Sequence, residues 1–277
     1  MKITIPVSKA LLVAALTFIA GVASAQHTVS KLWQTPATLA TPESVLPANG
    51  ILYVSLIDGD AWAKDGKGGI AKVSLSGKII DTSWVTGLNA PKGMAIRGNW
   101  LYIGDVDEVV VVNIKTGKVD HKVPVKGAKG LNDVTVDKAG AVYVSDSMTG
   151  LVHKIVGNKV TTFLQNQKGV NGLRAVNDKL YVLTGDGAYI VGTDKTPMKL
   201  TTLEHGGDGI EPVGNGDMLA TAWQGYLYYI QANGNKDVLL DTHSTNDKTA
   251  DIGYDAKSRI IYVPTFLGKS VVAYKLK

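Results

Sequence analysis

Short runs in which apolar and polar residues alternate recur along the chain from residue 51 onward. One set of runs has a Tyr or another apolar residue at its centre, and its six copies lie at 51–55, 100–104, 141–145, 179–183, 217–221 and 260–264. Alternation with a period of two residues predicts half-buried strands, and no stretch after the first 25 residues sustains the 3.6-residue apolar period of a helix. The chain is therefore expected to be all-β, with few helices.

Each of these runs is followed, after a polar turn, by a second run of similar character. The second runs that stand out lie at 69–73, 109–113, 151–155, 226–230 and 270–274. Turns such as Ser76-Gly77-Lys78 then lead to a third, more polar strand. Repeats of roughly 40 residues that each contain several antiparallel strands are typical of a β-propeller. A β-sandwich or barrel is the alternative, and the regular repeat argues against it.

A propeller ring has to close, and the chain after residue 264 has room for a single further strand. Residues 28–38 precede the first repeat and have the pattern of a strand. We therefore predict a six-bladed β-propeller, with its last blade closed by this N-terminal strand. Residues 26–277 would then form one domain.

The first 25 residues have the pattern of a secretory signal peptide. Lys2 and Lys9 supply positive charge, residues 10–22 are mainly apolar, and Ala23-Ser24-Ala25 has the small residues of a cleavage site. A retained membrane anchor is the alternative, but the apolar stretch is short for a span, which needs about 20 residues. We expect a mature protein in the periplasm or outside the cell, with no stable membrane span.

Composition and charge narrow the function classes. Of the 277 residues, 31 are Gly and 19% are charged, a balance that favours a turn-rich β protein. The net charge of +5 is spread without a run of Lys or Arg, so no nucleic-acid partner is expected. The chain has no Cys, which suits an oxidising compartment.

One position, about ten residues before the centre of each repeat, is polar in all six copies. The first strand of a propeller blade lines the central channel, so these side chains are expected to meet at one end of that channel. Counting back by this offset gives, in blade order, Glu43, Lys92, Asn132, Asn171, Asp208 and Asp251.

Carboxylates and amides from separate blades would form an oxygen-rich cluster. Ca²⁺ takes roughly six to eight oxygen ligands in irregular geometry, and the lack of Cys and His at these positions disfavours a dedicated zinc or copper site. The same residue types also cap strands through hydrogen bonds from side chain to backbone. The spacing alone leaves both interpretations open.

The order of these residues resembles the regucalcin (senescence marker protein)/gluconolactonase family of six-bladed propellers. The match rests on Glu43, on Asn132-Asp133 with residues 136–140, and on Asn171-Gly172 and Asp208-Gly209. The resemblance implies that Glu43, Asn171 and Asp208 hold a divalent cation, with Ca²⁺ expected first and Mg²⁺, Mn²⁺ or Zn²⁺ as alternatives. It also implies that Asn132 lies beside the cation and helps to hold a small-molecule substrate.

By the same resemblance, the activity would be hydrolysis of a lactone or a similar small cyclic ester. Asp208 would be the general base, and Asn132 and Lys92 would orient substrate oxygens. Lys92 and Asp251 depart from the family pattern, since one places a cation and the other an extra negative charge near the expected metal. A Lys92–Asp251 pair across the cavity would cancel both charges.

A second function class stays open, namely a non-catalytic propeller that binds a small ligand or a protein partner, because the fold does not decide between the two. His205, three residues before Asp208, is either a proton shuttle or an exposed loop residue. Trp62, Trp84, Trp100 and Trp223 are expected to pack blades or to lie at the rim rather than to form a platform for a sugar.

Overall fold

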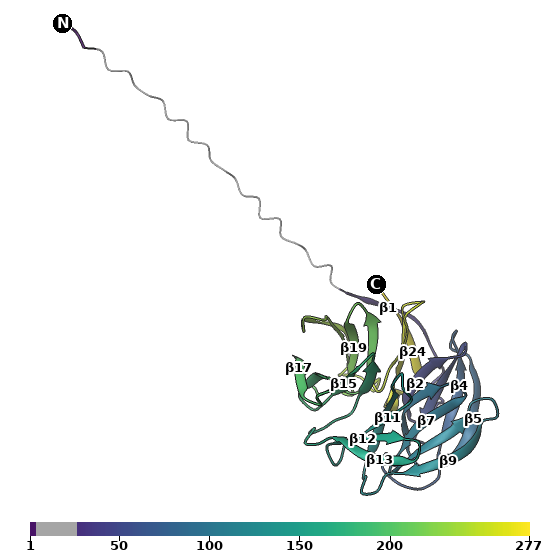
Figure 1. The fold of residues 1–277 in the computed structure, drawn as a ribbon. Helices are drawn as coiled ribbons and strands as arrows, with labels where there is room; N and C mark the ends of the chain where they lie inside the picture. Colours follow the sequence, from purple (N-terminus) through teal and green to yellow (C-terminus); the bar gives the residue numbers. More distant parts are fainter. Residues whose placement is uncertain (4–26) are drawn as a thin grey trace.

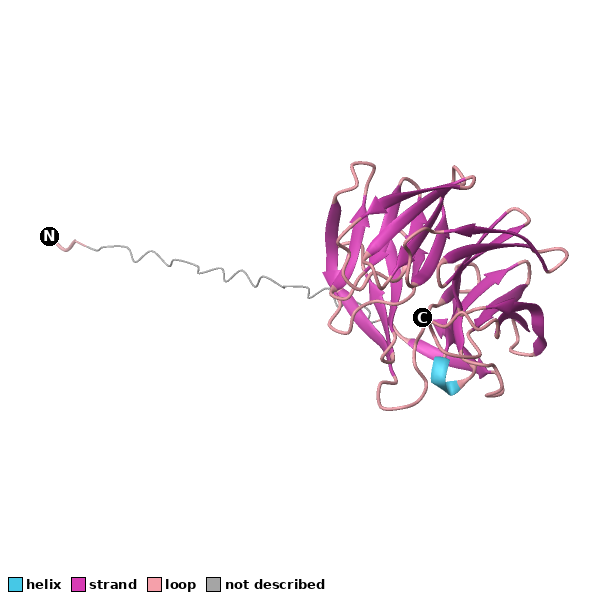
Figure 2. Cartoon of the chain, turned by 90° about the horizontal axis from the view of Figure 1, so that it is seen from below, coloured by secondary structure: helices cyan, strands magenta, loops and turns pink. Residues whose placement is uncertain are grey.

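A computed structural model describes residues 1–3 and 27–277 of the chain. The predicted signal peptide therefore lies almost wholly outside the described residues. Residues 27–277 form six four-stranded antiparallel sheets, which are the blades of a propeller, and one short 3-10 helix, η1 (Phe266–Gly268). Figure 1 shows the labelled strands, and Figure 2 shows the strands in magenta and η1 in cyan. The prediction of an all-β six-bladed propeller is confirmed.

Five blades each take four consecutive strands. Blade 1 consists of β2 (Pro42–Ala48), β3 (Ile51–Leu56), β4 (Gly68–Ser74) and β5 (Ile79–Leu88), and blade 2 of β6 (Pro91–Arg97), β7 (Trp100–Asp105), β8 (Glu108–Asn113) and β9 (Lys118–Pro124). Blade 3 consists of β10 (Leu131–Val136), β11 (Val142–Asp146), β12 (Leu151–Val156) and β13 (Lys159–Leu164), and blade 4 of β14 (Leu173–Val176), β15 (Lys179–Leu183), β16 (Gly187–Val191) and β17 (Pro197–Thr202). Blade 5 consists of β18 (Ile210–Gly214), β19 (Asp217–Ala222), β20 (Tyr226–Ile230) and β21 (Lys236–Asp241).

The sixth blade joins the two ends of the chain. It contains β22 (Gly253–Asp255), β23 (Ile260–Pro264) and β24 (Val271–Leu276), and its outer strand is β1 (Val29–Gln34). β1 pairs antiparallel with β24, with Val29 opposite Leu276. The predicted closure of the last blade by an N-terminal strand is therefore confirmed. Residues 27–277 contain no helix other than η1, and no described helix is long and apolar enough to cross a membrane.

Apolar cores lie between neighbouring blades, one for each of the six interfaces. They follow from the two-residue alternation of the middle strands, which sends successive side chains to opposite faces of a blade. In β7, Leu101 and Ile103 pack toward blade 1, whereas Tyr102 between them packs toward blade 3. Full burial of one such aliphatic side chain contributes about 1.5–3 kcal/mol.

Trp33 anchors β1 to the rest of the ring. Its ring packs against the core between blades 6 and 1, with its centroid 5.9 Å from that of Tyr262. The indole N–H donates a hydrogen bond to the backbone carbonyl of Leu75, at 3.1 Å. The closing strand is thus held by side-chain contacts on two blades as well as by backbone pairing.

The inner strands β2, β6, β10, β14, β18 and β22 touch one another in order around the axis, and β22 touches β2. A parallel bridge between Ser44, in β2, and Asp251, two residues before β22, joins the first and last blades. Because each blade is a four-stranded meander, all six inner strands begin at the same end of the ring. We call this end the mouth.

Candidate functional site

The predicted site residues lie where the inner strands begin. Glu43, Lys92 and Asn132 are the second residues of β2, β6 and β10, whereas Asn171 and Asp208 lie two residues before β14 and β18. Four of the five are buried, and Asn171 is half-buried. The structure thus places one of these side chains on each of the first five blades at the mouth.

Side-chain oxygens of the second strands fix the backbone next to the site. The hydroxyl of Ser145 accepts the N–H of Asp133, at 3.0 Å, and that of Thr221 accepts the N–H of Gly209, at 2.9 Å. Each acceptor lies near the end of a middle strand, and each donor directly follows a site residue. The site residues therefore sit on backbone that is held by buried hydrogen bonds, which are costly to break.

Buried aspartates hold the segments that lead into the inner strands. The carboxylate of Asp105, at the end of β7, accepts the N–H groups of Asn89 and Ala90. Asp146, at the end of β11, accepts the N–H groups of Lys129 and Gly130 in the same way. These contacts set the entry of the chain just before Lys92 and Asn132.

Asn171 and Asp208 are in direct contact. The Asn171 side-chain N–H donates to Asp208 Oδ1, at 2.7 Å. Burial raises the pKa of Asp208 to about 8, and the charge of Asp251 adds to this, whereas the Asn171 hydrogen bond and the Lys92 charge act in the opposite direction.

Glu43 completes a cluster of mutually interacting charges with Asp208 and Lys92. Burial raises the pKa of Glu43 well above its ordinary value, Asp208 raises it further, and Lys92 lowers it. Glu43 Oε2 and Asn171 Oδ1 are buried and have no hydrogen-bond partner among the described residues. Buried polar atoms are nearly always satisfied, so two such atoms in one site indicate space for a ligand, an ion or water.

Lys92 is held by backbone oxygens rather than by a carboxylate. Its ammonium donates to the carbonyl of Ala61, at 2.5 Å, and to that of Ala90, at 3.1 Å. It also lies 4.2 Å from the ring centroid of Trp62, which is a cation–π contact. Burial lowers the pKa of Lys92.

The suggested Lys92–Asp251 ion pair does not form. Asp251 Oδ2 instead accepts a hydrogen bond from the Ser44 hydroxyl, at 2.5 Å. The backbone hydrogen bonds explain this. In blade 5, the N–H of Asp208 donates to the carbonyl of Thr221, near the end of the second strand. In blade 6, the equivalent bond runs from the N–H of Ala250 to the carbonyl of Pro264. Ala250 therefore holds the mouth position of blade 6, and Asp251 lies one residue deeper. A fixed offset misses this because the length of the connection varies between blades.

Below the mouth lies a second polar layer that the sequence analysis missed. It surrounds a cavity of about 10 Å³, on the scale of a single water molecule. The Asp133 carboxylate accepts the N–H of Val134 and, across the blade interface, the N–H of Leu173. Deeper still, Arg174 and Glu211 form an ion pair at 2.9 Å. The sequence does contain a sign of this layer, because Asp133, Arg174 and Glu211 are charged residues within inner strands that are otherwise largely apolar.

The residues at the mouth fit a hard cation only if carboxylate oxygens are combined with other oxygen ligands. Among the described residues, no three side chains of His, Cys, Asp or Glu are grouped so as to hold a metal ion. A cation at the mouth would therefore need amide oxygens or water besides Glu43 and Asp208. The side-chain oxygen of Asn171, which has no hydrogen-bond partner among residues 27–277, meets that need.

His205 and the tryptophans occupy more defined places than the sequence indicated. The His205 ring stacks on Tyr226, at 4.1 Å between centroids, and His243 stacks on the same Tyr at 5.6 Å. Trp84 contributes to the core between blades 1 and 2, whereas Trp223 is exposed in the β19–β20 turn. The role of His205 as a proton shuttle stays a prediction.

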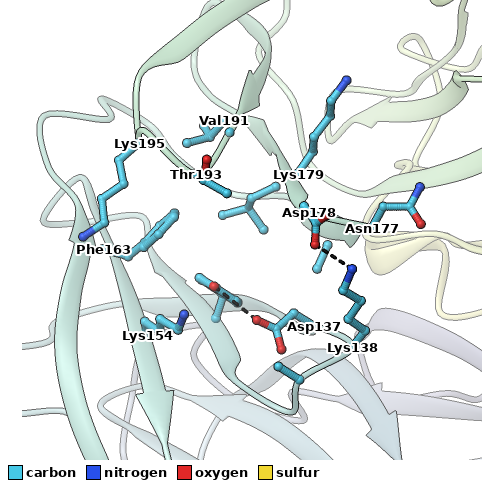
Figure 3. A pocket seen from close by; sticks show the side chains of 15 residues that line it. Asp137, Lys138, Lys154, Phe163, Asn177, Asp178, Lys179, Val191, Thr193 and Lys195 are labelled. Atoms are coloured by element: carbon cyan, nitrogen blue, oxygen red, sulfur yellow. Dashed lines mark hydrogen bonds and ion pairs between the residues drawn. The ribbon is translucent and has the colours of Figure 1, made fainter.

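Two larger cavities lie between blades 3 and 4. One of about 300 Å³ is lined by Lys154, Phe163 and Lys195 among others, and contains none of the predicted site residues (Figure 3). The other, of about 930 Å³, includes Ser147. Asn132 donates to the Ser147 hydroxyl, at 3.1 Å, so this second cavity begins beside the mouth.

No model of a known protein family and no curated protein matches the sequence. Solved structures do match in three dimensions. A streptogramin B lyase is similar with a TM-score of 0.67 and 10% identity, over 91% of this chain and 98% of that one. A catalytically inactive virginiamycin B lyase from Staphylococcus aureus with Quinupristin gives 0.64 and 15%, over 91% and 100%.

A putative gluconolactonase is similar with a TM-score of 0.68 and 13% identity, over 91% of this chain and 93% of that one. At such low identity, these likenesses show the fold alone. The chain therefore shares a six-bladed propeller fold with a putative gluconolactonase and with streptogramin lyases.

Proposed function

We propose that this protein is a divalent-metal-dependent hydrolase that opens a lactone or a similar small cyclic ester at the mouth. The observation that carries the proposal is a pair of buried oxygens, Glu43 Oε2 and Asn171 Oδ1, that have no hydrogen-bond partner within the described part of the chain and lie with the carboxyl group of Asp208. The fold shared with a putative gluconolactonase supports it at the level of analogy.

Glu43, Asn171 and Asp208 would hold the cation. When bound, the cation supplies positive charge that polarises the ester carbonyl and favours the ionised form of Asp208. The local charges suit this, because Asp208 and Asp251 both raise the pKa of Glu43, and Asp251 also raises the pKa of Asp208. Positive charge among them would relieve that repulsion.

Asp208 would act as the general base. Asn171 occupies its Oδ1, and no described side chain donates a hydrogen bond to its Oδ2. Oδ2 would take a proton from the water whose oxygen attacks the carbonyl carbon. The ring C–O bond then breaks, and the proton passes to the leaving alkoxide oxygen, so the product is a hydroxy acid.

Lys92 and Asn132 would orient the substrate. A Lys ammonium has three protons, and two of those of Lys92 point to the carbonyls of Ala61 and Ala90. The third is available to a substrate oxygen. Asn132 uses its side-chain N–H on Ser147 and keeps its amide oxygen for a substrate hydroxyl.

The test is a lactone panel assayed with Ca²⁺, Mg²⁺, Mn²⁺ or Zn²⁺ and again with a chelator. We expect turnover that the chelator abolishes and that Asp208→Asn lowers by at least about 100-fold, the scale of a lost general base. Asp178→Asn is the matched control, since Asp178 is exposed and pairs with Lys138 away from the mouth. Hydrolysis by Asp208→Asn at the wild-type rate would refute the mechanism.

A non-catalytic, ligand-binding propeller is the second candidate, and the buried ammonium of Lys92 favours it. A cation that binds only the folded protein raises its melting temperature. If no cation shifts the melting temperature and no lactone is hydrolysed, the binding function is the better reading.

A further inference from the structure

The turns between the second and third strands of the blades lie around the mouth, one per blade. Five of the six carry a bulky apolar side chain, and the sixth, in blade 4, carries Gly185 instead. In blade order these side chains are Trp62, Val106, Met148, Trp223 and, in blade 6, Phe266 with Leu267. Met148, Trp223 and Leu267 are between 40% and 51% exposed.

Several of these side chains lie close together. A Cβ added to Gly130 would lie within 3.0 Å of both the Trp62 ring and the Met148 side chain, so the two residues lie over the same glycine. Phe266 meets Trp223 edge to face, with centroids 5.6 Å apart. Phe266 also packs, like Ala61, on a small core beneath the mouth. We call Trp62, Met148, Trp223, Phe266 and Leu267 the apolar arc.

The apolar arc begins at the candidate site. The Trp62 ring lies 4.2 Å from the Lys92 ammonium, and the preceding residue, Ala61, accepts one of its hydrogen bonds. A substrate oxygen held by Lys92 would therefore have the Trp62 ring as its neighbour. A polar substrate that fills only the channel would not contact the apolar arc.

The side of the mouth without such a turn residue is recessed instead. The cavity of about 930 Å³ opens there, and its lining includes Ser147, Gln167, Lys168 and Asp186. Asn132 reaches it through the hydrogen bond to Ser147. The mouth thus has an apolar border over blades 5, 6, 1 and 3, and a recess of mixed character at blade 4.

We propose that the substrate is amphiphilic: a lactone or cyclic ester whose polar reacting group is held at the mouth and whose large apolar substituent lies on the apolar arc. This inference rests on the proposed function for the reacting group. The arc itself argues for the substituent, because exposed aromatic and Met side chains gathered at one site mark a binding surface.

Binding can be tested without hydrolysis, using γ-lactams with alkyl substituents of increasing length in titration calorimetry. The lactam nitrogen replaces the ester oxygen and resists hydrolysis. We expect the Kd to fall about fourfold for each added methylene that the arc covers, which corresponds to about 0.8 kcal/mol per methylene. Trp223→Ala should remove most of the gain for the long chains and leave the shortest lactam unchanged.

Trp223 is a suitable target because it is 40% exposed and its loss should leave the fold intact. Trp62→Ala is the second variant, and Met198→Ala, 63% exposed on the outer strand of blade 4, is the matched control. A Kd that does not change with chain length, or an equal loss in the Met198 control, would overturn the inference. Lactone turnover in the same preparation reports separately on the proposed function.

Discussion

The hydroxyl of Thr221 links the inner strand of blade 5 to blade 6, directly beside the candidate site. It accepts the Gly209 N–H and donates to the Ala250 carbonyl, both at 2.9 Å, and the side chain is fully buried. Thr221→Val keeps the shape of the side chain and removes only this pair of hydrogen bonds. Two buried groups are then left without a partner.

Each buried group that loses its partner costs about 1–3 kcal/mol. Because valine fills the same volume, no cavity contribution is added, and we expect Thr221→Val to lower the free energy of unfolding by about 4 kcal/mol. This is a large share of the roughly 5–15 kcal/mol by which proteins of ordinary stability are held. Urea denaturation followed by circular dichroism measures the change.

Two variants separate the hydroxyl from the methyl group. Thr221→Ser keeps the hydrogen bonds and loses one methyl, so it should cost about 1 kcal/mol. Thr162→Val, on the exposed outer strand of blade 3, should stay within about 0.5 kcal/mol of the wild type. If Thr221→Ser is as destabilising as Thr221→Val, packing of the methyl group matters more than the hydroxyl, and the reasoning fails.

Two further predictions concern the axis and the ring closure. Burial raises the pKa of Glu211 from an ordinary 4.5 to about 7, although the charge of Arg174 acts in the opposite direction. The protonated carboxyl therefore contributes stability that is fully present below about pH 4.5 and is lost as pH rises through about 7. The change amounts to about 3 kcal/mol, and Glu211→Gln should flatten this part of the stability–pH curve; an unchanged curve would contradict the assignment. Trp33→Ala should cost about 2 kcal/mol in urea denaturation, since its ring is half-buried against two blades. Leu32→Ala, 49% exposed on the same strand, is its control. If both variants lose the same free energy of unfolding, the contacts of Trp33 contribute no more than those of an exposed side chain.

Most of the fold was predictable because propeller blades repeat. The two-residue alternation located all six middle strands, and the strand pattern before the first repeat was enough to predict the role of β1. These features are local in sequence or recur at a steady interval, so a single chain displays them. The polar residues that open the inner strands were found for the same reason.

What the sequence did not predict depends on contacts between blades. The partners of Lys92 are backbone carbonyls, one of them on a loop of blade 1, and no side-chain pattern encodes them. The Arg174–Glu211 pair joins residues whose separation follows from the angle between two blades. The sequence predicted Asp251 at the mouth, whereas it lies one residue deeper, because a fixed offset from the second strand does not allow for connections of different length.

The pairing of Val29 with Leu276 has a consequence for how the molecule is made. The sixth sheet needs one segment from the start and one from the end of the propeller, so it cannot be completed until residue 276 has been synthesised. Contacts at such sequence separation slow folding. The partly built ring would meanwhile expose the unpaired edge of β24, which makes this step the one at which a chaperone or an unwanted neighbour would compete with β1.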